Sequence, residues 1–134
     1  VLEDIREING MLLNGKRRTR SELKAQYYPI WNFDHIQCEE DNPWNKWGPE
    51  RLEDDESVRA RAHAALVWIW ERPERDIALV AHGGIFNLLT NGHPLVEVGP
   101  GVNNRFGNCE LRNCLLSVSS IGEEETRFRL ELAS

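Results

Sequence analysis

The chain of 134 residues has few cysteines, no excess of basic residues and no long hydrophobic run. Its three cysteines form neither an even set nor a CxxC pair, so we expect neither a disulfide framework nor a zinc site, and a reducing compartment fits best. No apolar stretch approaches the ~20 residues that span a bilayer, so we expect no membrane span. The net charge of −6 argues against a nucleic-acid partner, because neutralising phosphates needs an excess of Lys and Arg.

The start of the chain carries no visible targeting signal, since the segment VLEDIREI lacks a basic stretch followed by an apolar one. We therefore expect an intracellular, cytoplasmic protein, with an organelle as the alternative if a targeting segment lies upstream. The first residue is Val1 and not Met, so we expect the natural start upstream. The remaining composition, with 40% hydrophobic residues, is typical of one globular domain over residues 1–134.

The stretch IALVAHGGIF changes character at its histidine. Residues 77–81 are a short apolar run typical of a strand that is buried on both faces. His82, Gly83 and Gly84 then predict a tight turn, and the apolar pattern that begins at Ile85 has helical spacing. In open parallel sheets ligands bind at such a turn, because the free N–H groups of the helix N-terminus carry partial positive charge. A hydrogen-bonded structural histidine is the alternative for His82.

The other predicted elements alternate in the manner of an α/β domain. We expect the end of a strand at residues 1–5, a short helix from Thr19 or Ser21 to Tyr28, a helix over residues 56–71, and a hairpin of strands at residues 110–118 and 127–132. Residues 30–54 contain three tryptophans and no clear period, which indicates a long functional loop or a hidden element. Residues 91–108 are rich in turn formers.

Two further segments carry polar residues beside predicted strands. Glu7 follows Arg6 after the first strand, where its carboxyl group is a general acid or the two residues form a surface ion pair worth ~0–1 kcal/mol. Asn108 and Glu110 stand at the start of a later strand, where they are site residues or turn formers. Taken singly, the first segment is explained by a surface ion pair and the second by turn formation.

In this order and spacing, the motifs resemble the histidine phosphatase superfamily, which includes cofactor-dependent phosphoglycerate mutases, and above all its plant and fungal phosphoglycerate mutase-like members. The resemblance covers residues 1 to about 118 and corresponds to the C-terminal two thirds of such a protein. The matching motifs are Arg6-Glu7 with Gly10, residues 16–23, Pro29 with Phe33-Asp34, Trp44, Val58 with Arg61, Trp68, and residues 70–74, 77–82 and 106–112.

The resemblance implies an α/β fold with a three-layer, mainly parallel sheet, and phosphoryl transfer from a phosphorylated small molecule through a phosphohistidine, without metal or cofactor. His82 matches the histidine that hydrogen-bonds the phosphoryl group, and the Gly83 N–H would help at the same oxygens. Glu7 matches the acid that protonates the leaving oxygen. Arg17 and Arg18 match basic residues near the substrate entrance, where they would hold a second anionic group.

The chain departs from the family pattern at the nucleophile. The family's nucleophilic histidine stands in an Arg-His-Gly motif after the first strand, and none of His35, His63 and His93 has that setting. We therefore expect the isolated chain to be inactive, and an upstream segment or a partner chain to complete the sheet. The alternative is a non-catalytic structural or binding subunit of a larger assembly. A nucleotide-binding module is disfavoured, because no Gly-rich loop ends in Lys-Ser or Lys-Thr.

Overall fold

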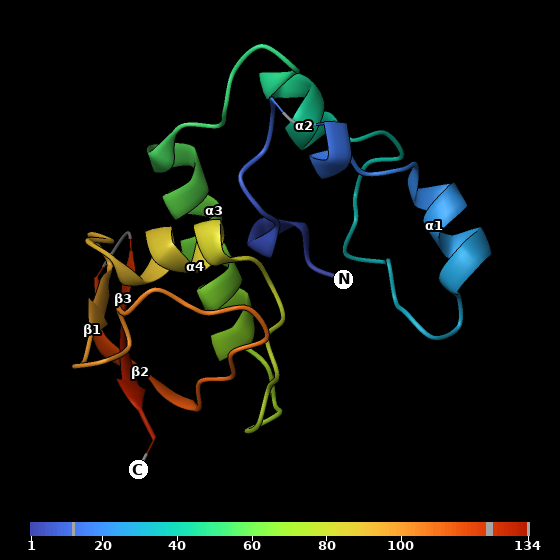
Figure 1. The fold of residues 1–134 in the computed structure, drawn as a ribbon. Helices are drawn as coiled ribbons and strands as arrows, with labels where there is room; N and C mark the ends of the chain where they lie inside the picture. Colours follow the sequence, from blue (N-terminus) through green and yellow to red (C-terminus); the bar gives the residue numbers. More distant parts are fainter. Residues whose placement is uncertain (12, 123–124, 134) are drawn as a thin grey trace.

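The computed structural model describes residues 1–11, 13–122 and 125–133, with only the backbone of Asn14 (Figure 1). In chain order the elements are the single turns η1 (Glu3–Ile5) and η2 (Leu13–Gly15), the helices α1 (Arg20–Tyr27), α2 (Asn42–Trp47), α3 (Asp55–Trp70) and α4 (Gly83–Thr90), and the strands β1 (Val96–Val98), β2 (Cys114–Ile121) and β3 (Thr126–Leu132). No helix within these residues is long and apolar enough to cross a membrane.

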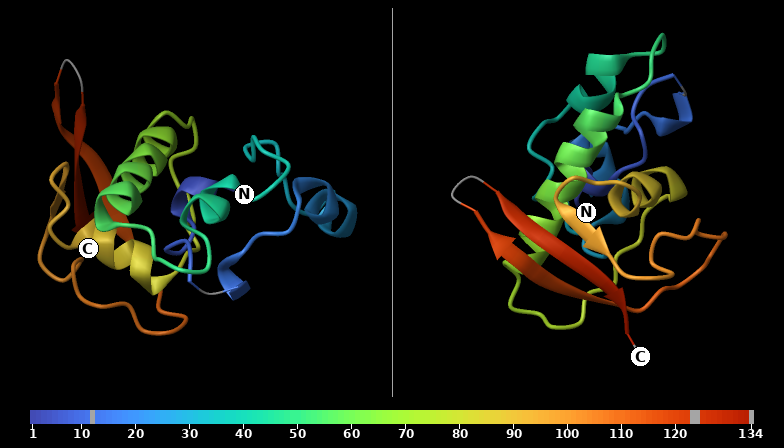
Figure 2. Two further views of the ribbon diagram at one scale, coloured as in Figure 1. Left: turned by 90° about the horizontal axis from the view of Figure 1, so that it is seen from above. Right: turned by 90° about the vertical axis from the view of Figure 1, so that its left-hand side faces the viewer.

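The strands form one small mixed sheet in the order β1–β3–β2. β1 pairs with β3 in parallel, with Val96 opposite Phe128, and β2 pairs with β3 in antiparallel, with Leu116 opposite Leu130. The antiparallel pair confirms the predicted hairpin, although β2 begins only at Cys114. Helices α3 and α4 lie on the same face of the sheet (Figure 2). The described residues are therefore α/β, but they do not form the expected three-layer, mainly parallel sheet.

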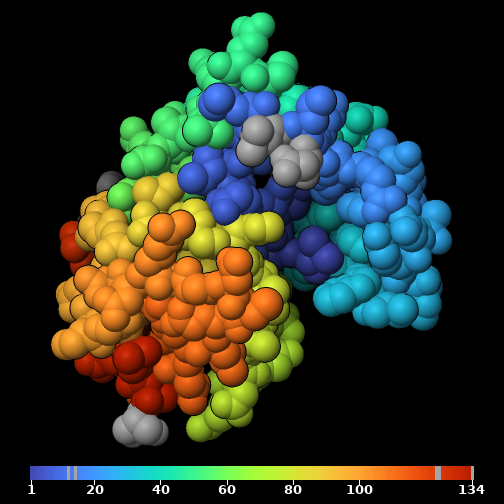
Figure 3. All heavy atoms as spheres, viewed as in Figure 1, coloured from blue at the N-terminus to red at the C-terminus, as the bar shows by residue number. Residues whose placement is uncertain are grey.

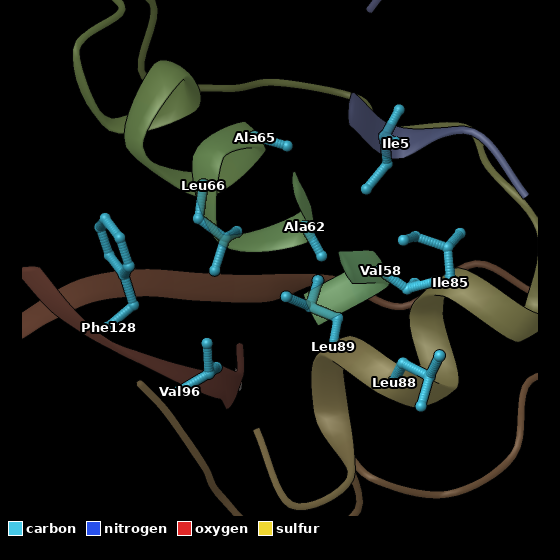
Figure 4. Packing of buried hydrophobic residues seen from close by; sticks show 10 residues of the cluster. All are labelled: Ile5, Val58, Ala62, Ala65, Leu66, Ile85, Leu88, Leu89, Val96 and Phe128. Carbon is cyan, nitrogen blue, oxygen red and sulfur yellow. The ribbon is translucent and has the colours of Figure 1, made fainter. Parts of the chain in front are cut away.

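The core lies between the sheet and these two helices (Figure 4). α3 confirms the helix predicted over residues 56–71, and it begins after Asp54, whose side chain accepts a hydrogen bond from the Ser57 N–H. The buried members of the cluster are Ile5, Val58, Ala62, Ala65, Leu66, Ile85, Leu88, Leu89, Val96 and Phe128. Burying each of the larger side chains stabilises the fold by about 1.5–3 kcal/mol. This core fixes α4, and with it the residues at the N-terminus of that helix.

The strand predicted at residues 77–81 does not form. These residues have no assigned secondary structure and form no ladder with another strand of the described chain. Leu79 and Ala81 pack against the core, whereas Val80 is 90% exposed. A strand needs a neighbouring backbone for its N–H and C=O groups, and the described residues supply none here. The prediction from apolar composition is therefore wrong for this structure.

The strand predicted at residues 1–5 is also wrong, since Glu3–Ile5 form the single turn η1. The carbonyl oxygens of Asp4 and Arg6 accept hydrogen bonds from Arg61 of α3 instead of from a neighbouring strand. A side chain thus satisfies the backbone of this segment, and a ladder is not required.

The N-terminal helices follow their local signals. α1 confirms the predicted short helix, because Thr19 and Glu22 form a reciprocal capping box at its start and Pro29 follows soon after its end. α2 is the element hidden in residues 30–54; it begins after Asp41, whose carboxylate accepts a hydrogen bond from the Trp44 N–H. β1 is the element missed in the turn-rich residues 91–108, where three residues are too few to show a period.

Candidate active site

The N-terminus of α4 holds a carboxylate from a distant part of the chain. The N–H groups of Gly84 and Ile85 donate hydrogen bonds to the two carboxylate oxygens of Glu7, at 3.2 and 3.1 Å, and the Ile8 N–H donates a third at 2.9 Å. The N-cap residue itself, His82, makes no capping hydrogen bond with its side chain. The first N–H groups of a helix lack partners within it and stabilise negative charge. Glu7 therefore caps α4 in place of His82.

His82 and Gly83 are the solvent-exposed residues at the N-terminus of α4. Both residues are exposed, and within the described chain no group hydrogen-bonds the His82 ring or the Gly83 N–H. Two of the candidate residues, Glu7 and His82, thus come from distant segments and lie at the same end of α4. A ring nitrogen and a backbone N–H that are both exposed can bind an incoming anion.

The two glycines after His82 have different surroundings. A Cβ atom at Gly84 would lie 2.3 Å from Oε1 of Glu7, whereas a Cβ atom at Gly83 would meet nothing within 4 Å. Gly84 is therefore needed for the close approach of Glu7 to the helix, while the space beside Gly83 is open to solvent or a ligand.

Arg61 of α3 attaches the Glu7 segment to the core. Its guanidinium donates hydrogen bonds to the carbonyl oxygens of Asp4, Arg6 and Glu7, at 3.0, 2.7 and 3.1 Å. It also donates to both carboxylate oxygens of Glu53, at 2.9 and 3.0 Å. Burial raises the pKa of the Glu53 carboxyl, but the hydrogen bonds that it accepts, first among them those from Arg61, outweigh burial and hold its pKa below the ordinary value.

The motif comparison includes Arg61 but gives it no role, and the sequence itself contains a signal for one. Arg61 lies three residues after Val58 and four before Ala65, and both of these neighbours are fully buried. It therefore interrupts the apolar face of an amphipathic helix. A charged side chain on such a face must find hydrogen-bond acceptors, which marks Arg61 as a residue that binds another part of the chain.

Arg17 takes part in a separate network near the N-terminus. Its side chain is 8% exposed, and its Nε donates to Glu3 at 2.7 Å. Its remaining N–H groups donate to the carbonyl oxygens of Arg18, Cys38, Glu39 and Glu40. In this arrangement all five N–H groups are engaged. A role in binding a substrate anion stays a prediction that requires these bonds to rearrange.

Arg18 is exposed and lies against Tyr27 of α1. Its guanidinium carbon is 5.6 Å from the centroid of the Tyr27 ring, and its N–H groups bond the Tyr27 hydroxyl and Gln26. No contact joins Arg18 to Glu7 or His82 in the part of the chain that the structure describes. Its assignment to the substrate entrance also stays a prediction.

Asp41 organises the N-terminal segment. Its buried carboxylate accepts two hydrogen bonds from Arg6, at 2.6 and 2.8 Å, one from the Arg17 N–H and one from the Trp44 N–H. Burial raises the pKa of Asp41, but these hydrogen bonds outweigh burial and hold its pKa below the ordinary value. Arg6 therefore belongs to a buried ion pair with Asp41, and not to the surface pair with Glu7 that the sequence suggested.

The segment FGNCELR folds as a turn beside α4. The guanidinium of Arg112 lies 3.7 Å from the centroid of the Phe106 ring, and Phe106 stacks on Phe86 of α4 with 4.9 Å between centroids. Glu110 accepts hydrogen bonds from the Gly107 N–H at 2.5 Å and from Arg112 at 2.6 Å. Of the two alternatives for Glu110, the structure supports the turn former.

Two hollows of the described surface lie apart from this helix end. One open apolar groove is lined by Val1, Leu23, Tyr27, Trp31 and Phe33, and neither it nor a second hollow beside β2 includes Glu7 or His82. No three His, Cys, Asp or Glu side chains in the described ranges converge as a metal site requires. The helix end is thus an open surface within these residues.

Comparison with known proteins identifies the family. Residues 1–132 match the family model described as the histidine phosphatase superfamily (branch 1). The chain belongs to this superfamily. The resemblance inferred from its motifs is therefore confirmed.

Three Arabidopsis thaliana proteins are similar to this histidine phosphatase chain. The phosphoglycerate mutase-like protein 1 is 34% identical over 119 residues, which cover 85% of this chain and 40% of that protein. The phosphoglycerate mutase-like protein is 31% identical and the phosphoglycerate mutase-like protein 2 is 30% identical, each over 104 residues, or 75% of this chain and 37% or 29% of the relative. The chain thus spans two fifths or less of the length of these relatives. No solved structure matches it significantly.

Proposed function

We propose that the chain supplies a general acid and a phosphate-binding histidine to the phosphoryl-transfer site of a phosphoglycerate mutase-like histidine phosphatase. The observation that carries the proposal is the position of Glu7 at the N-terminus of α4, where it binds the N–H groups of Gly84 and Ile85 beside the exposed His82 and Gly83. A carboxyl group, an imidazole and a backbone N–H are the groups that bind a phosphoryl group and protonate its leaving oxygen. The substrate is a phosphorylated small molecule, and the family resemblance implies no metal or cofactor.

The reaction has two steps. A nucleophilic histidine attacks phosphorus, so that a P–N bond forms, the P–O bond to the alcohol breaks, and Glu7 gives its proton to the departing oxygen. A water oxygen then attacks the phosphorus of the phosphohistidine, so that a P–O bond forms and the P–N bond breaks. Glu7 takes a proton from that water, and inorganic phosphate leaves the regenerated histidine. In both steps His82 and the Gly83 N–H hydrogen-bond the phosphoryl oxygens and stabilise their charge.

The nucleophile belongs to a segment outside these 134 residues. The rings of His63 and His93 stack on each other with 6.0 Å between centroids, and the His35 ring packs against Trp68. These histidines therefore make packing contacts, and in the described residues no hydrogen bond or ring contact joins them to Glu7 or His82. An Arg-His-Gly segment supplied by the rest of the protein or by a partner chain is the source that the family pattern implies.

The same segment would complete the sheet beside residues 77–81. Leu79 and Ala81 already face the core, while the 90% exposure of Val80 leaves the other side uncovered. An apolar segment whose backbone is not paired in a ladder can pair with an additional strand. We expect the completed sheet to be the three-layer, mainly parallel sheet of the family pattern. Arg17 and Arg18 would then hold a second anionic group of the substrate, once the hydrogen bonds that engage all five side-chain N–H groups of Arg17 rearrange.

Turnover of an aryl phosphate tests the proposal. We expect no activity from residues 1–134 alone, and we expect turnover with an acid-labile phosphohistidine from the protein that also carries the Arg-His-Gly segment. His82→Ala in that protein should reduce kcat by at least about 100-fold, as removal of one transition-state hydrogen-bond donor does. Activity of residues 1–134 alone that His82→Ala abolishes would overturn the assignment of the nucleophile.

A non-catalytic subunit is the second candidate function. The absence of an Arg-His-Gly motif from the sequence favours it. It predicts that the protein with the completing segment binds inorganic phosphate or a partner chain without turnover.

Sedimentation at micromolar concentration adds a further test, because we expect residues 1–134 alone to self-associate through residues 77–81, and Val80→Lys to reduce that association.

A further inference from the structure

We propose that Arg61, acting with Glu53, is a positioning residue that sets the Glu7 carboxylate against the N-terminus of α4. The inference rests on the proposed function in so far as Glu7 is the general acid. Its geometric part, the dependence of the Glu7 position on Arg61, stands independently of any activity.

The backbone before and at Glu7 is held from one side. Arg61 donates hydrogen bonds to the carbonyl oxygens of Asp4, Arg6 and Glu7. Three carbonyls within four residues are thereby bound by one guanidinium on α3, a helix whose other buried residues form the core. The peptide that carries the Glu7 side chain is therefore attached to the most firmly packed part of the molecule.

The backbone after Glu7 is held by the partner of Arg61. Glu53, with a side chain 3% exposed, accepts hydrogen bonds from both the N–H and the side-chain amide of Asn9, at 3.1 and 2.7 Å. The Glu53 N–H in turn donates to the Asn9 carbonyl oxygen at 2.9 Å. The ion pair thus fixes the chain on both sides of Glu7, whose carboxylate then reaches Gly84 and Ile85.

Only an arginine can make this set of contacts. Arg61 uses all five N–H groups of a planar guanidinium, two toward Glu53 and three toward backbone carbonyls. A lysine has three N–H groups on one nitrogen and cannot span these acceptors. A displacement of about 1 Å at a catalytic group can lower the rate 100-fold. Arg61→Lys should therefore lower the rate, although Arg61 itself does not contact the substrate.

Amide hydrogen exchange at Gly84 and Ile85 tests the geometric part. These two N–H groups have no partner within α4, so their protection reports the Glu7 carboxylate. In the full chain, Arg61→Lys should accelerate exchange at both amides roughly tenfold relative to the interior of α4, as expected for the loss of a hydrogen bond. Glu7→Ala should give the same acceleration, because it removes the acceptor.

Arg59→Lys is the matched control. Arg59 lies on the same helix and donates to the carbonyl oxygens of Leu88 and Asn91 at the opposite end of α4, at 2.8 and 2.9 Å. The Arg59→Lys substitution should leave amide exchange at Gly84 and Ile85 unchanged relative to the rest of α4. Equal acceleration by Arg59→Lys, or none by Arg61→Lys, would overturn the proposal.

A kinetic readout separates positioning from general stability. In the protein with the completing segment, Arg61→Lys should lower kcat for an aryl phosphate with little change in KM, whereas Arg59→Lys should leave both unchanged. If Arg61→Lys accelerates amide exchange at Gly84 and Ile85 but the parent protein shows no turnover, the proposed function is refuted. The claim that Arg61 positions Glu7 then still stands. Turnover that Arg61→Lys leaves unaffected would refute the positioning and keep the function.

Discussion

The N-terminal 53 residues and the remainder of the chain are held together by different forces. In the second region, α3, α4 and the sheet share one apolar cluster, to which the first region contributes Ile5 as a buried member. In the first region the buried residues include Asn9, Asp41 and Glu53 as well as Phe33, Ile36 and Trp44. The Arg6–Asp41 ion pair connects segments of this region, and Glu53 pairs with Arg61 of α3. Figure 3 shows the two regions, blue to cyan and green to red, side by side.

The candidate site lies where these regions meet. The polar region supplies Glu7 and the apolar region supplies His82 and Gly83 on a helix that packing fixes. Directional hydrogen bonds set the position of a carboxylate more sharply than apolar contacts do, whereas apolar burial supplies more stability per residue. The difference explains why a short, irregular segment can carry a precisely placed acid.

Phe128→Ala should have the largest effect on stability. Phe128 is fully buried and contacts the rings of His63 and Trp70, so its truncation removes apolar contact and leaves a cavity. We expect a loss of about 3–5 kcal/mol in the free energy of unfolding, measured with urea. Phe128→Leu, which keeps most of the volume, should cost markedly less; equal losses would mean that packing at this site is loose.

Asp41→Asn should have an intermediate effect confined to the first region. The amide keeps the helix cap toward Trp44 but leaves the part-buried Arg6 with Glu3, at 3.2 Å, as its charged partner in place of the two-point pair with Asp41, which costs about 1–3 kcal/mol. Hydrogen exchange should accelerate in residues 1–50 more than in α3. Asp34→Asn, which removes an exposed pair with Lys24, is the control and should change nothing measurable. Uniform acceleration across the chain would show that the two regions unfold as one unit.

Gly84→Ala should displace Glu7 from the N-terminus of α4 but change the free energy of unfolding little. The new methyl group would displace the flexible end of the Glu7 side chain, while alanine itself favours the helix, so the free energy of unfolding should change by less than about 1 kcal/mol. The Ile85 amide should lose its protection from exchange and turnover should fall. Gly83→Ala, which meets no neighbour, is the matched control and should retain that protection. If both substitutions behaved alike, steric contact with Glu7 would not be the cause.

The same contrast explains what the sequence could predict. α1, α3 and the β2–β3 hairpin were predictable, because caps such as Thr19 and apolar periods such as that of Val58 and Ala62 act within a few residues. Residues 77–81 were not, because a strand depends on a neighbouring backbone from elsewhere. At the site, the turn at His82 was visible locally. That Glu7 belongs to the same site as His82 was expected only from the family resemblance. The backbone partners of Arg61 were not predictable, because these carbonyl groups are more than 50 residues away.

Acid should weaken the two regions in different pH windows. Burial lowers the pKa of His93 below its ordinary value of 6.5, against the raising effects of the Arg59 carbonyl and Glu125 and with a smaller lowering effect of neighbouring His63 and Arg59. The unfolded chain therefore binds a proton below pH 6.5 that the folded chain does not, and the free energy of unfolding falls as pH decreases below 6.5. The pKa values of Asp41 and Glu53 lie below 3.8 and 4.5, so their stabilisation is lost only in more acidic solution.

His93→Gln should remove the upper window and leave the lower one, which is the smallest effect expected here. A single proton limits the slope to about 1.4 kcal/mol per pH unit. Urea unfolding at pH 5.0 to 7.5, followed by the fluorescence of the tryptophans, should show a flatter stability profile in the variant than in the parent protein. Nδ1 of the parent ring accepts a hydrogen bond from the Leu95 N–H, which only the neutral ring can do, while Nε2 contacts the Arg59 carbonyl. An unchanged profile in the variant would mean that acid acts on the apolar region through another group, and that the two regions share one acid transition.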